Sequence, residues 1–156
     1  MSKKQLSEIN YFEDYKMLAI GSHLKDYALC YHINLVLDLD LIKYDDLIPN
    51  YLSNNESAFS WYFFVDDISK TSYYLIANKC SSGILLPSQK TTDYFFIIKN
   101  PVNDSFVKNI AAKLRNVKNI TAVLDVNMQQ QKNLDLIIEA NELHELEVVK
   151  QNNLLF

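Results

Sequence analysis

AFSWYFFVDDISKTSYYLIAN, residues 58–78, sets the architecture that the sequence predicts. Both ends of this stretch are dense in aromatic and branched apolar residues, which favour β-strands. We expect one strand over residues 58–65 and a second over residues 72–78. The connection DDISK, residues 66–70, is short and polar, so the two strands are predicted to form a β-hairpin.

Alternation along these strands predicts apolar side chains on both faces of the sheet. In the first strand, Phe59, Trp61 and Phe63 fall on one face, and residues 93–99 predict a further strand of the same sheet. Helices cover only one face of a two-layer domain, so the other must be covered by the C-terminal tail, a ligand or another chain. We expect that second face to comprise Tyr62, Phe64, Tyr74, Ile76, Phe96 and Ile98.

Residues 15–22 predict a buried strand, and a helix follows it. Ser22 is a residue type that caps helices, so we expect the helix to begin there. Its inward face, from the helical spacing, would comprise Leu24, Ala28, Tyr31 and Leu35.

A second helix is predicted after Asp104 or Ser105, either of which can cap it, and a strand follows over residues 121–127. The tail over residues 128–156 suggests a helix that ends near Asn141 and then a last strand or a continuation of that helix. The inward residues would be Phe106, Ile110, Leu114 and Val117 in the helix and Ala122, Leu124 and Val126 in the strand.

The order of these elements predicts a single α+β domain over residues 1–156. We expect a two-layer sandwich with a largely antiparallel sheet and helices on one face, in a split β-α-β-like arrangement. The C-terminal tail, residues 128–156, would be appended to it as helical or extended chain. Residues 1–12 are expected to be disordered.

Composition excludes several classes of protein. A chain of 156 residues buries enough surface to fold without a metal or a disulfide. Two glycines are too few for a glycine-rich phosphate loop. No apolar signal segment or membrane span is apparent, and the isolated Cys30 and Cys80 fit reduced thiols, although one disulfide stays open. We therefore expect a cytoplasmic protein that does not enter a membrane.

The net charge is −4, and Arg115 is the only arginine among the 15 basic residues. Arginine is the usual residue for bidentate recognition of phosphate and guanine. This composition argues against nucleic-acid binding, although aromatic strand residues can stack on RNA bases.

The segment LPSQKTTDY, residues 86–94, carries a recognisable pattern. It is similar to the motif that names the IPExxxVDY family of uncharacterised bacterial proteins, with Leu86, Pro87, Asp93 and Tyr94 at matching positions. The resemblance implies a bacterial protein of the Bacteroidota type and implies no activity. Independently of any family, such a motif is typical of turn chemistry, in which proline ends a loop and aspartate accepts bonds from loop amides.

Three groups of residues could suggest chemistry, and each has a simpler explanation. Ser22, His23 and Asp26 are too local for a catalytic triad, and no nucleophile-elbow pattern accompanies them. The acid pairs, such as Asp66-Asp67, lack the spacing of a calcium loop and suit a turn. His144 with its glutamate neighbours is short of a zinc ligand set. We therefore predict no catalytic residue, no metal site and no cofactor.

The sequence favours a non-enzymatic interaction or assembly module, acting as a homo-oligomer or with a protein partner through the second sheet face. The alternative is a small-ligand-binding domain that uses the same face and the 78–90 loop, with Asp93 and Tyr94 as polar groups.

Overall fold

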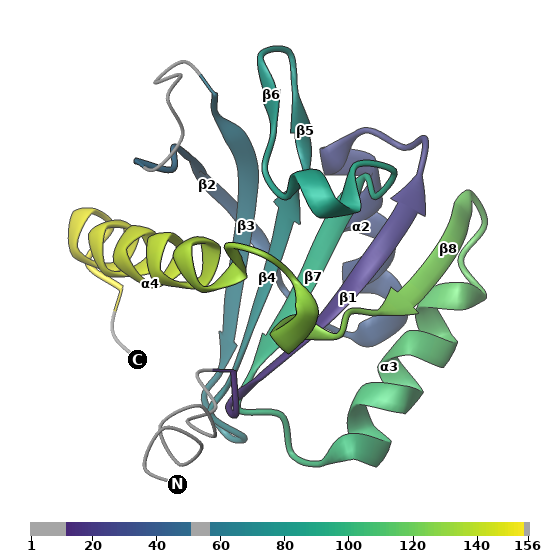
Figure 1. Ribbon diagram of the computed structural model, residues 1–156. Helices are drawn as coiled ribbons and strands as arrows, with labels where there is room; N and C mark the ends of the chain where they lie inside the picture. The colour runs from purple at the N-terminus through teal and green to yellow at the C-terminus, as the bar shows by residue number, and fades with distance from the viewer. Residues whose placement is uncertain (1–11, 51–56, 155–156) are drawn as a thin grey trace, which may run out of the picture.

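The sheet of this protein has six strands, and every neighbouring pair runs antiparallel (Figure 1). The computed structural model describes residues 12–50 and 57–154. The strand order is β2-β3-β4-β7-β1-β8. The strands are β1 (Tyr15–Ser22), β2 (Ile42–Leu47), β3 (Phe59–Asp66), β4 (Thr71–Ala77), β7 (Tyr94–Lys99) and β8 (Ile120–Asp125), and a separate small hairpin pairs β5 (Lys79–Cys80) with β6 (Gly83–Ile84).

Three α-helices accompany the sheet in the described ranges: α2 (Asp26–Leu37), α3 (Asp104–Arg115) and α4 (Leu134–Gln151). Two short 3-10 turns, η1 (Pro87–Gln89) and η2 (Met128–Gln130), lie in the connections. The predicted α+β sandwich with a largely antiparallel sheet is confirmed. The predicted disorder of residues 1–12 concerns residues 1–11, which lie outside the described ranges, and Phe12, which packs partly buried against the core.

The β3–β4 hairpin forms as its composition predicts. Trp61 pairs with Ile76, and Asp66 pairs with Thr71 at the turn. The Asp66 carboxylate accepts hydrogen bonds from the backbone N–H groups of Ile68 and Ser69, at 3.0 and 3.4 Å. Aspartate in this position closes the turn locally, which gives Asp66 a structural role in the hairpin.

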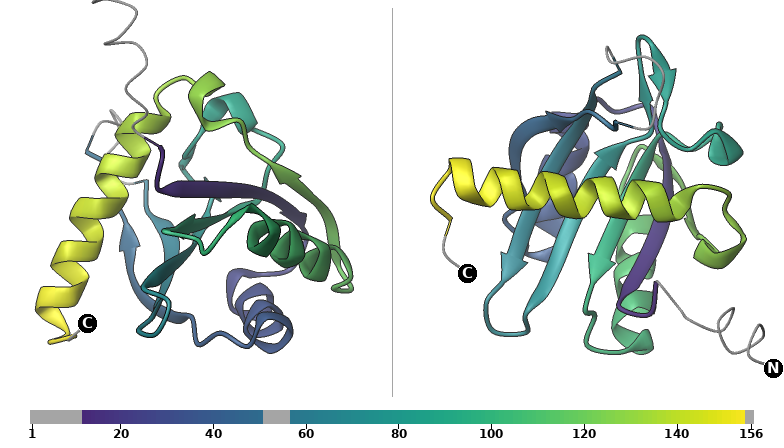
Figure 2. Two further views of the ribbon diagram at one scale, coloured as in Figure 1. Left: turned by 90° about the horizontal axis from the view of Figure 1, so that it is seen from below. Right: turned by 60° about the vertical axis from the view of Figure 1, so that its left-hand side comes forward.

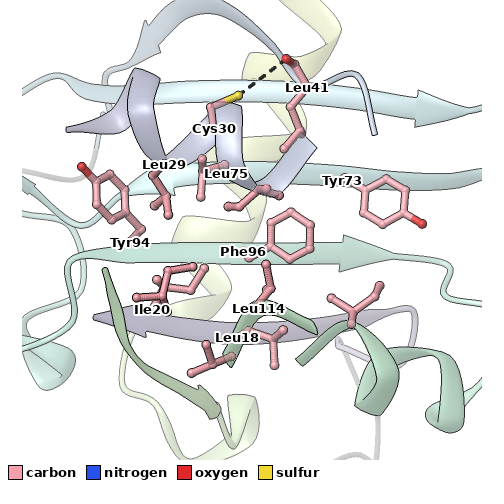
Figure 3. Close-up of a cluster of buried hydrophobic side chains, with 14 of the residues drawn as sticks. Leu18, Ile20, Leu29, Cys30, Leu41, Tyr73, Leu75, Tyr94, Phe96 and Leu114 are labelled. Carbon is pink, nitrogen blue, oxygen red and sulfur yellow. Dashed lines mark hydrogen bonds between the residues drawn. The ribbon is translucent and has the colours of Figure 1, made fainter. Parts of the chain in front are cut away.

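The split β-α-β arrangement lies at the other end of the sheet. β7 leads through α3 to β8, and β1 lies between these two strands and pairs with both of them. Helices α2 and α3 cover the same face of the sheet (Figure 2). The core between them and the sheet contains Leu18, Ile20, Leu29, Phe96 and Leu114 (Figure 3).

The C-terminal tail forms a third layer. Helix α4 runs across the strands on the face opposite to α2 and α3 (Figure 2). Its buried residues Leu134, Ile137, Ile138 and Val148 pack with the aromatic residues of the sheet into a second core. Complete burial of one such side chain stabilises the fold by about 1.5–3 kcal/mol, so this layer is a substantial part of the domain.

The predicted start and inward face of the first helix are wrong. Helix α2 begins at Asp26 after Lys25, and Ser22 is the last residue of β1. Its buried residues are Leu29, Cys30 and Ile33, whereas two predicted inward residues, Tyr31 and Leu35, are 63% and 70% exposed. The helix is apolar nearly all round, so its spacing did not select one face.

Two smaller predictions also need correction. Asn103, and neither Asp104 nor Ser105, caps α3 by accepting a hydrogen bond from the Phe106 N–H at 2.8 Å. In β8 the buried residues are Ile120 and Val123, and Leu124 is 62% exposed. Leu124 lies on an edge strand at the end of the sheet away from α4, so no helix covers it (Figure 1).

Candidate functional site

The six residues predicted to share the second face of the sheet divide between the two cores. Strand register places Leu75 opposite both Tyr62 and Phe96, so Leu75 shares their face. Side chains alternate, and Tyr74 and Ile76 therefore point to the other face. Tyr62, Phe64, Phe96 and Ile98 pack beneath α2 and α3, and Tyr74 and Ile76 pack beneath α4.

These residues are also covered. Tyr62, Tyr74, Ile76, Phe96 and Ile98 are at most 4% exposed, and Phe64 is partly buried. The tail, which the sequence left as one of three possible covers, forms α4 and covers the sheet face opposite to α2 and α3, to which Tyr74 and Ile76 belong. The six residues of the predicted second face are therefore part of the core, and a surface for partners must lie elsewhere on the molecule.

Helix α4 is held on the face of the sheet that carries Tyr15, Trp61 and Tyr74, by hydrogen bonds as well as by packing. Trp61 donates its indole N–H to Asn141 Oδ1 at 2.7 Å. Tyr15 donates its hydroxyl to Glu142 at 2.8 Å, and Tyr74 donates to Glu145. Burial, followed by the neighbouring glutamates, raises the pKa of Tyr15 and of Tyr74 well above the usual value for tyrosine. Both tyrosines are therefore protonated donors at neutral pH.

His144 lies in the same layer and has structural partners. Its Nε2 is 2.7 Å from the carbonyl oxygen of Asp45 in β2, and its ring meets Trp61 edge-on at a centroid distance of 4.5 Å. Glu142 and Glu145 accept hydrogen bonds from tyrosines, so three of the four residues considered for a metal, His144, Glu142 and Glu145, turn to three different partners, and the fourth, Glu147, is exposed. Over residues 12–50 and 57–154 no group of three or more His, Cys, Asp or Glu side chains is placed to hold a metal ion.

The segment that carries the family-like motif is organised by Asn78, a residue to which the sequence analysis gave no role. Asn78 is fully buried at the end of β4. Its Nδ2 donates to the carbonyls of Gln89 and Thr92 at 2.9 and 2.8 Å, and its Oδ1 accepts from the Leu86 N–H at 2.8 Å. One side chain thus holds both ends of the loop that contains Pro87.

Asp93 and Tyr94 fasten this loop to the connection between β1 and α2. Asp93 accepts a hydrogen bond from the Ser22 N–H at 2.9 Å and pairs with Lys79 at 3.0 Å. Tyr94 donates its hydroxyl to the Leu24 carbonyl at 2.7 Å, and burial, followed by two nearby aspartates, raises its pKa to about 12. These contacts agree with turn chemistry.

The loop does not leave a hollow against the sheet at its apolar residues. Leu85 and Leu86 are each 1% exposed and belong to the core beneath α4. Pro87 is exposed, and Ser88 beside it donates to Gln131 at 2.8 Å. The observed contacts of the 78–90 segment are therefore those of a packed connection.

Ser22, His23 and Asp26 do not meet as a triad. The Ser22 hydroxyl donates to the Asn119 carbonyl at 2.7 Å and accepts from the Leu24 N–H at 3.2 Å. Asp26 accepts from the Tyr62 hydroxyl and from Lys43. Burial alone would raise the pKa of Asp26, but these two hydrogen bonds outweigh it and hold the pKa below its usual value.

The surface of α2 carries apolar side chains that nothing in the described chain covers. Tyr27, Tyr31 and Leu35 lie at i, i+4 and i+8 and are 66%, 63% and 70% exposed. Asp26 is the only charged residue among the twelve of the helix. An exposed apolar row without charges is unusual for a solvated helix face. The sequence could have revealed this exposed apolar row, because residues 26–37 carry almost no charge.

Several hollows lie on the surface of the described residues. One, of about 520 Å³, lies beside β1 and β8 and has both signs of charge on its walls, including Lys16, Asp104 and Asp125. Two more, of about 480 and 290 Å³, run along the two sides of α4. None of these three hollows is lined by Asp93, Tyr94 or the predicted second face of the sheet.

Cys30 and Cys80 are both free thiols, which settles the question left open by the sequence. No helix in the described part of the chain is long and apolar enough to span a membrane.

Comparison with protein-family models, with curated proteins and with solved structures found no match. The resemblance to the IPExxxVDY family therefore stays a prediction.

Proposed function

We propose that this protein is a non-enzymatic assembly module that associates with a second copy of itself through the outer face of α2. The observation that carries the proposal is the exposed row of Tyr27, Tyr31 and Leu35 on a helix with one charged residue. Burying such a row removes apolar surface from water and requires no ion pairing.

A second copy suits this row because the row is symmetric along the helix. Tyr31 lies four residues from both Tyr27 and Leu35. Two antiparallel copies of α2 related by a two-fold axis would place Tyr31 at the axis and each Tyr27 against the partner's Leu35. No like charges would meet along the three positions.

The exposed area sets the expected strength. Two tyrosines that are about two-thirds exposed and one leucine at 70% offer roughly 400 Å² per copy. A standard interface buries about 800 Å² per partner, so we expect a weak, concentration-dependent dimer.

A reducing compartment fits the free thiols. Cys30 is buried and Cys80 partly exposed, and neither is paired. Unpaired cysteines are usual in the cytoplasm, where thiols stay reduced, and we place the protein there, in a bacterial cell.

Sedimentation velocity over a range of protein concentrations tests the proposal. The wild-type chain should shift from monomer to dimer as its concentration rises. Tyr31→Asp should abolish the shift, because the two-fold axis brings the new carboxylates together. Ile68→Asp is the matched control, since Ile68 is 96% exposed in the β3–β4 turn and gains the same charge.

Circular dichroism would establish that each variant is folded. A wild-type chain that stays monomeric at the highest concentration contradicts the proposal. Dimerisation of a folded Tyr31→Asp chain at the wild-type concentration also contradicts it.

A further inference from the structure

The outer side of α4 combines exposed apolar residues with hollows on both flanks. The hollow of about 480 Å³ is lined by Phe12, Ile138, Leu143 and Leu146 together with carboxylates. The hollow of about 290 Å³, on the side of β2, includes Ile48, Leu136 and Leu143. Both hollows share Leu143 and Glu139, so they form one continuous surface, which we name the α4 groove.

Three side chains of the α4 groove offer substantial apolar surface to solvent. Leu143, Leu146 and Ile48 are 54%, 67% and 52% exposed. Leu143 and Leu146 lie three residues apart, on the side of α4 that faces away from the sheet. The buried side of the same helix uses Ile137, Asn141 and Val148, so the outer leucines are not needed for docking α4 on the sheet.

The charges around the α4 groove have one sign. The carboxylates that line it are Asp135, Glu139, Glu142 and Glu147, and the described residues that line the two hollows include no lysine or arginine. A second copy of this chain would bring the same carboxylates face to face, and a nucleic acid or an anionic membrane would bring phosphates. A partner that carries positive charge is the one that this rim attracts.

We propose that the α4 groove binds a basic amphipathic helix of a partner protein. Apolar residues on one face of that helix would enter the hollows beside Leu143 and Leu146. Lysine or arginine residues at the borders of that face would meet Glu139 and the neighbouring carboxylates. Recognition of this kind reads apolar anchors at helical spacing and takes its orientation from the charged rim.

The α4 groove and the outer row of α2 lie on opposite faces of the sheet. The binding proposed for α4 therefore does not depend on the self-association proposed for α2. Each can fail without the other, and variants on one surface serve as controls for the other.

The test uses fluorescein-labelled synthetic peptides and the full chain, with binding followed by fluorescence anisotropy. The probe is a helical peptide of leucine and lysine whose leucines form one face. Its control is a peptide of the same composition in permuted order, in which the leucines form no face. Non-specific attraction to a chain of net charge −4 affects both peptides, so only the difference between them reports on the α4 groove.

Two variants carry the decision, each with a control of the same charge change. Leu146→Asp removes an apolar anchor while it adds negative charge, and Ile68→Asp makes the same charge change in the β3–β4 turn. Glu139→Lys reverses a rim charge, and Asp67→Lys reverses an exposed charge beside Ile68. We expect Leu146→Asp and Glu139→Lys to weaken binding of the amphipathic peptide at least tenfold, and the two controls to change it less than twofold.

Equal binding of the amphipathic and permuted peptides would overturn the proposal. So would equal affinity of the Leu146→Asp and Ile68→Asp chains for the amphipathic peptide. The Tyr31→Asp chain should keep the wild-type affinity for the peptide, which separates this result from the outcome of the dimerisation experiment.

Discussion

Replacement of Asn78 by alanine should destabilise the protein more than most substitutions of a polar residue. The Asn78 side chain makes three hydrogen bonds, with the backbone of Leu86, Gln89 and Thr92, at 2.8–2.9 Å. Each contributes about 1 kcal/mol net, and loss of the partner leaves buried backbone groups unsatisfied. We therefore expect Asn78→Ala to lower the free energy of unfolding by about 3 kcal/mol, which for a domain of this size lowers Tm by about 10 °C.

Urea denaturation followed by circular dichroism measures this change. Asn78→Asp gives a second test, because aspartate keeps an acceptor for the Leu86 N–H but turns an oxygen toward two carbonyls. We expect Asn78→Asp to be at least as destabilising as Asn78→Ala. Asn109→Ala is the matched control, since Asn109 is exposed on α3 and should change stability by less than about 0.5 kcal/mol.

A loss below about 1 kcal/mol in Asn78→Ala would refute the assignment of this side chain as the organiser of the loop. Wild-type stability of Asn78→Asp would refute the orientation of the amide, because a carboxylate cannot donate to Gln89 and Thr92. Either result would also reopen a functional interpretation of the segment from Leu86 to Tyr94.

Three other predictions concern pH and the edge of the sheet. The pKa of Asp26 is lowered in the folded state, so its contribution to the free energy of unfolding is present above about pH 4 and lost as pH falls through the folded pKa. In urea titrations, the stability of Asp26→Asn should therefore decline less steeply in acid than that of the wild type, and an equal decline contradicts this. The pKa of Tyr74 is raised in the folded state, so its contribution to the free energy of unfolding is full below about pH 10 and lost as pH rises. Tyr74→Phe should therefore lose less stability than the wild type in alkaline solution, and an equal loss would show that Tyr74 is not the titrating group. Arg115 donates two hydrogen bonds, at 3.1 and 2.8 Å, to the Val123 carbonyl on edge strand β8. Because free carbonyls on an edge strand can pair with another chain, Arg115→Ala should scatter more light from aggregates than the control Lys113→Ala. Equal scattering by the two variants argues against a protective role of Arg115.

The fold class was predictable because its signals are local. The aromatic hairpin, the turn closed by Asp66 and the strand of residues 93–99 each follow from neighbouring residues and not from distant contacts. These elements determine an antiparallel sheet, and the helices α2 and α3 complete the α+β sandwich.

The assignment of residues to faces was not predictable in the same way. All seven residues of β4 are buried, so alternation gives no phase for a run such as Tyr73-Tyr74-Leu75-Ile76. Only pairing with β3 and β7 decides which of them point toward α4. In α2, where one residue in twelve is charged, the helical period equally leaves the inward face undecided.

The role of Asn78 depends on distant partners. Its side chain bonds to residues 8, 11 and 14 positions further along the chain, which a local pattern does not encode. The length of α4 was left open by the sequence, because Leu146, Val148 and Val149 suit either a last strand or a continuation of the helix, and the structure shows the continuation, to Gln151.

Both faces of the sheet are covered within one chain, so the two surfaces proposed for binding lie on the outer sides of the helices α2 and α4. The outer row of α2 is uncharged and can meet its own copy, whereas the acidic α4 groove repels its own copy. A dimer formed through α2 would leave both α4 grooves free, because α4 lies on the opposite face of each sheet. Such a dimer would hold two sites for basic helices in a fixed relation. A partner with two such segments would bind it far more tightly than a partner with one, and Tyr31→Asp should remove that difference while leaving single-segment binding unchanged.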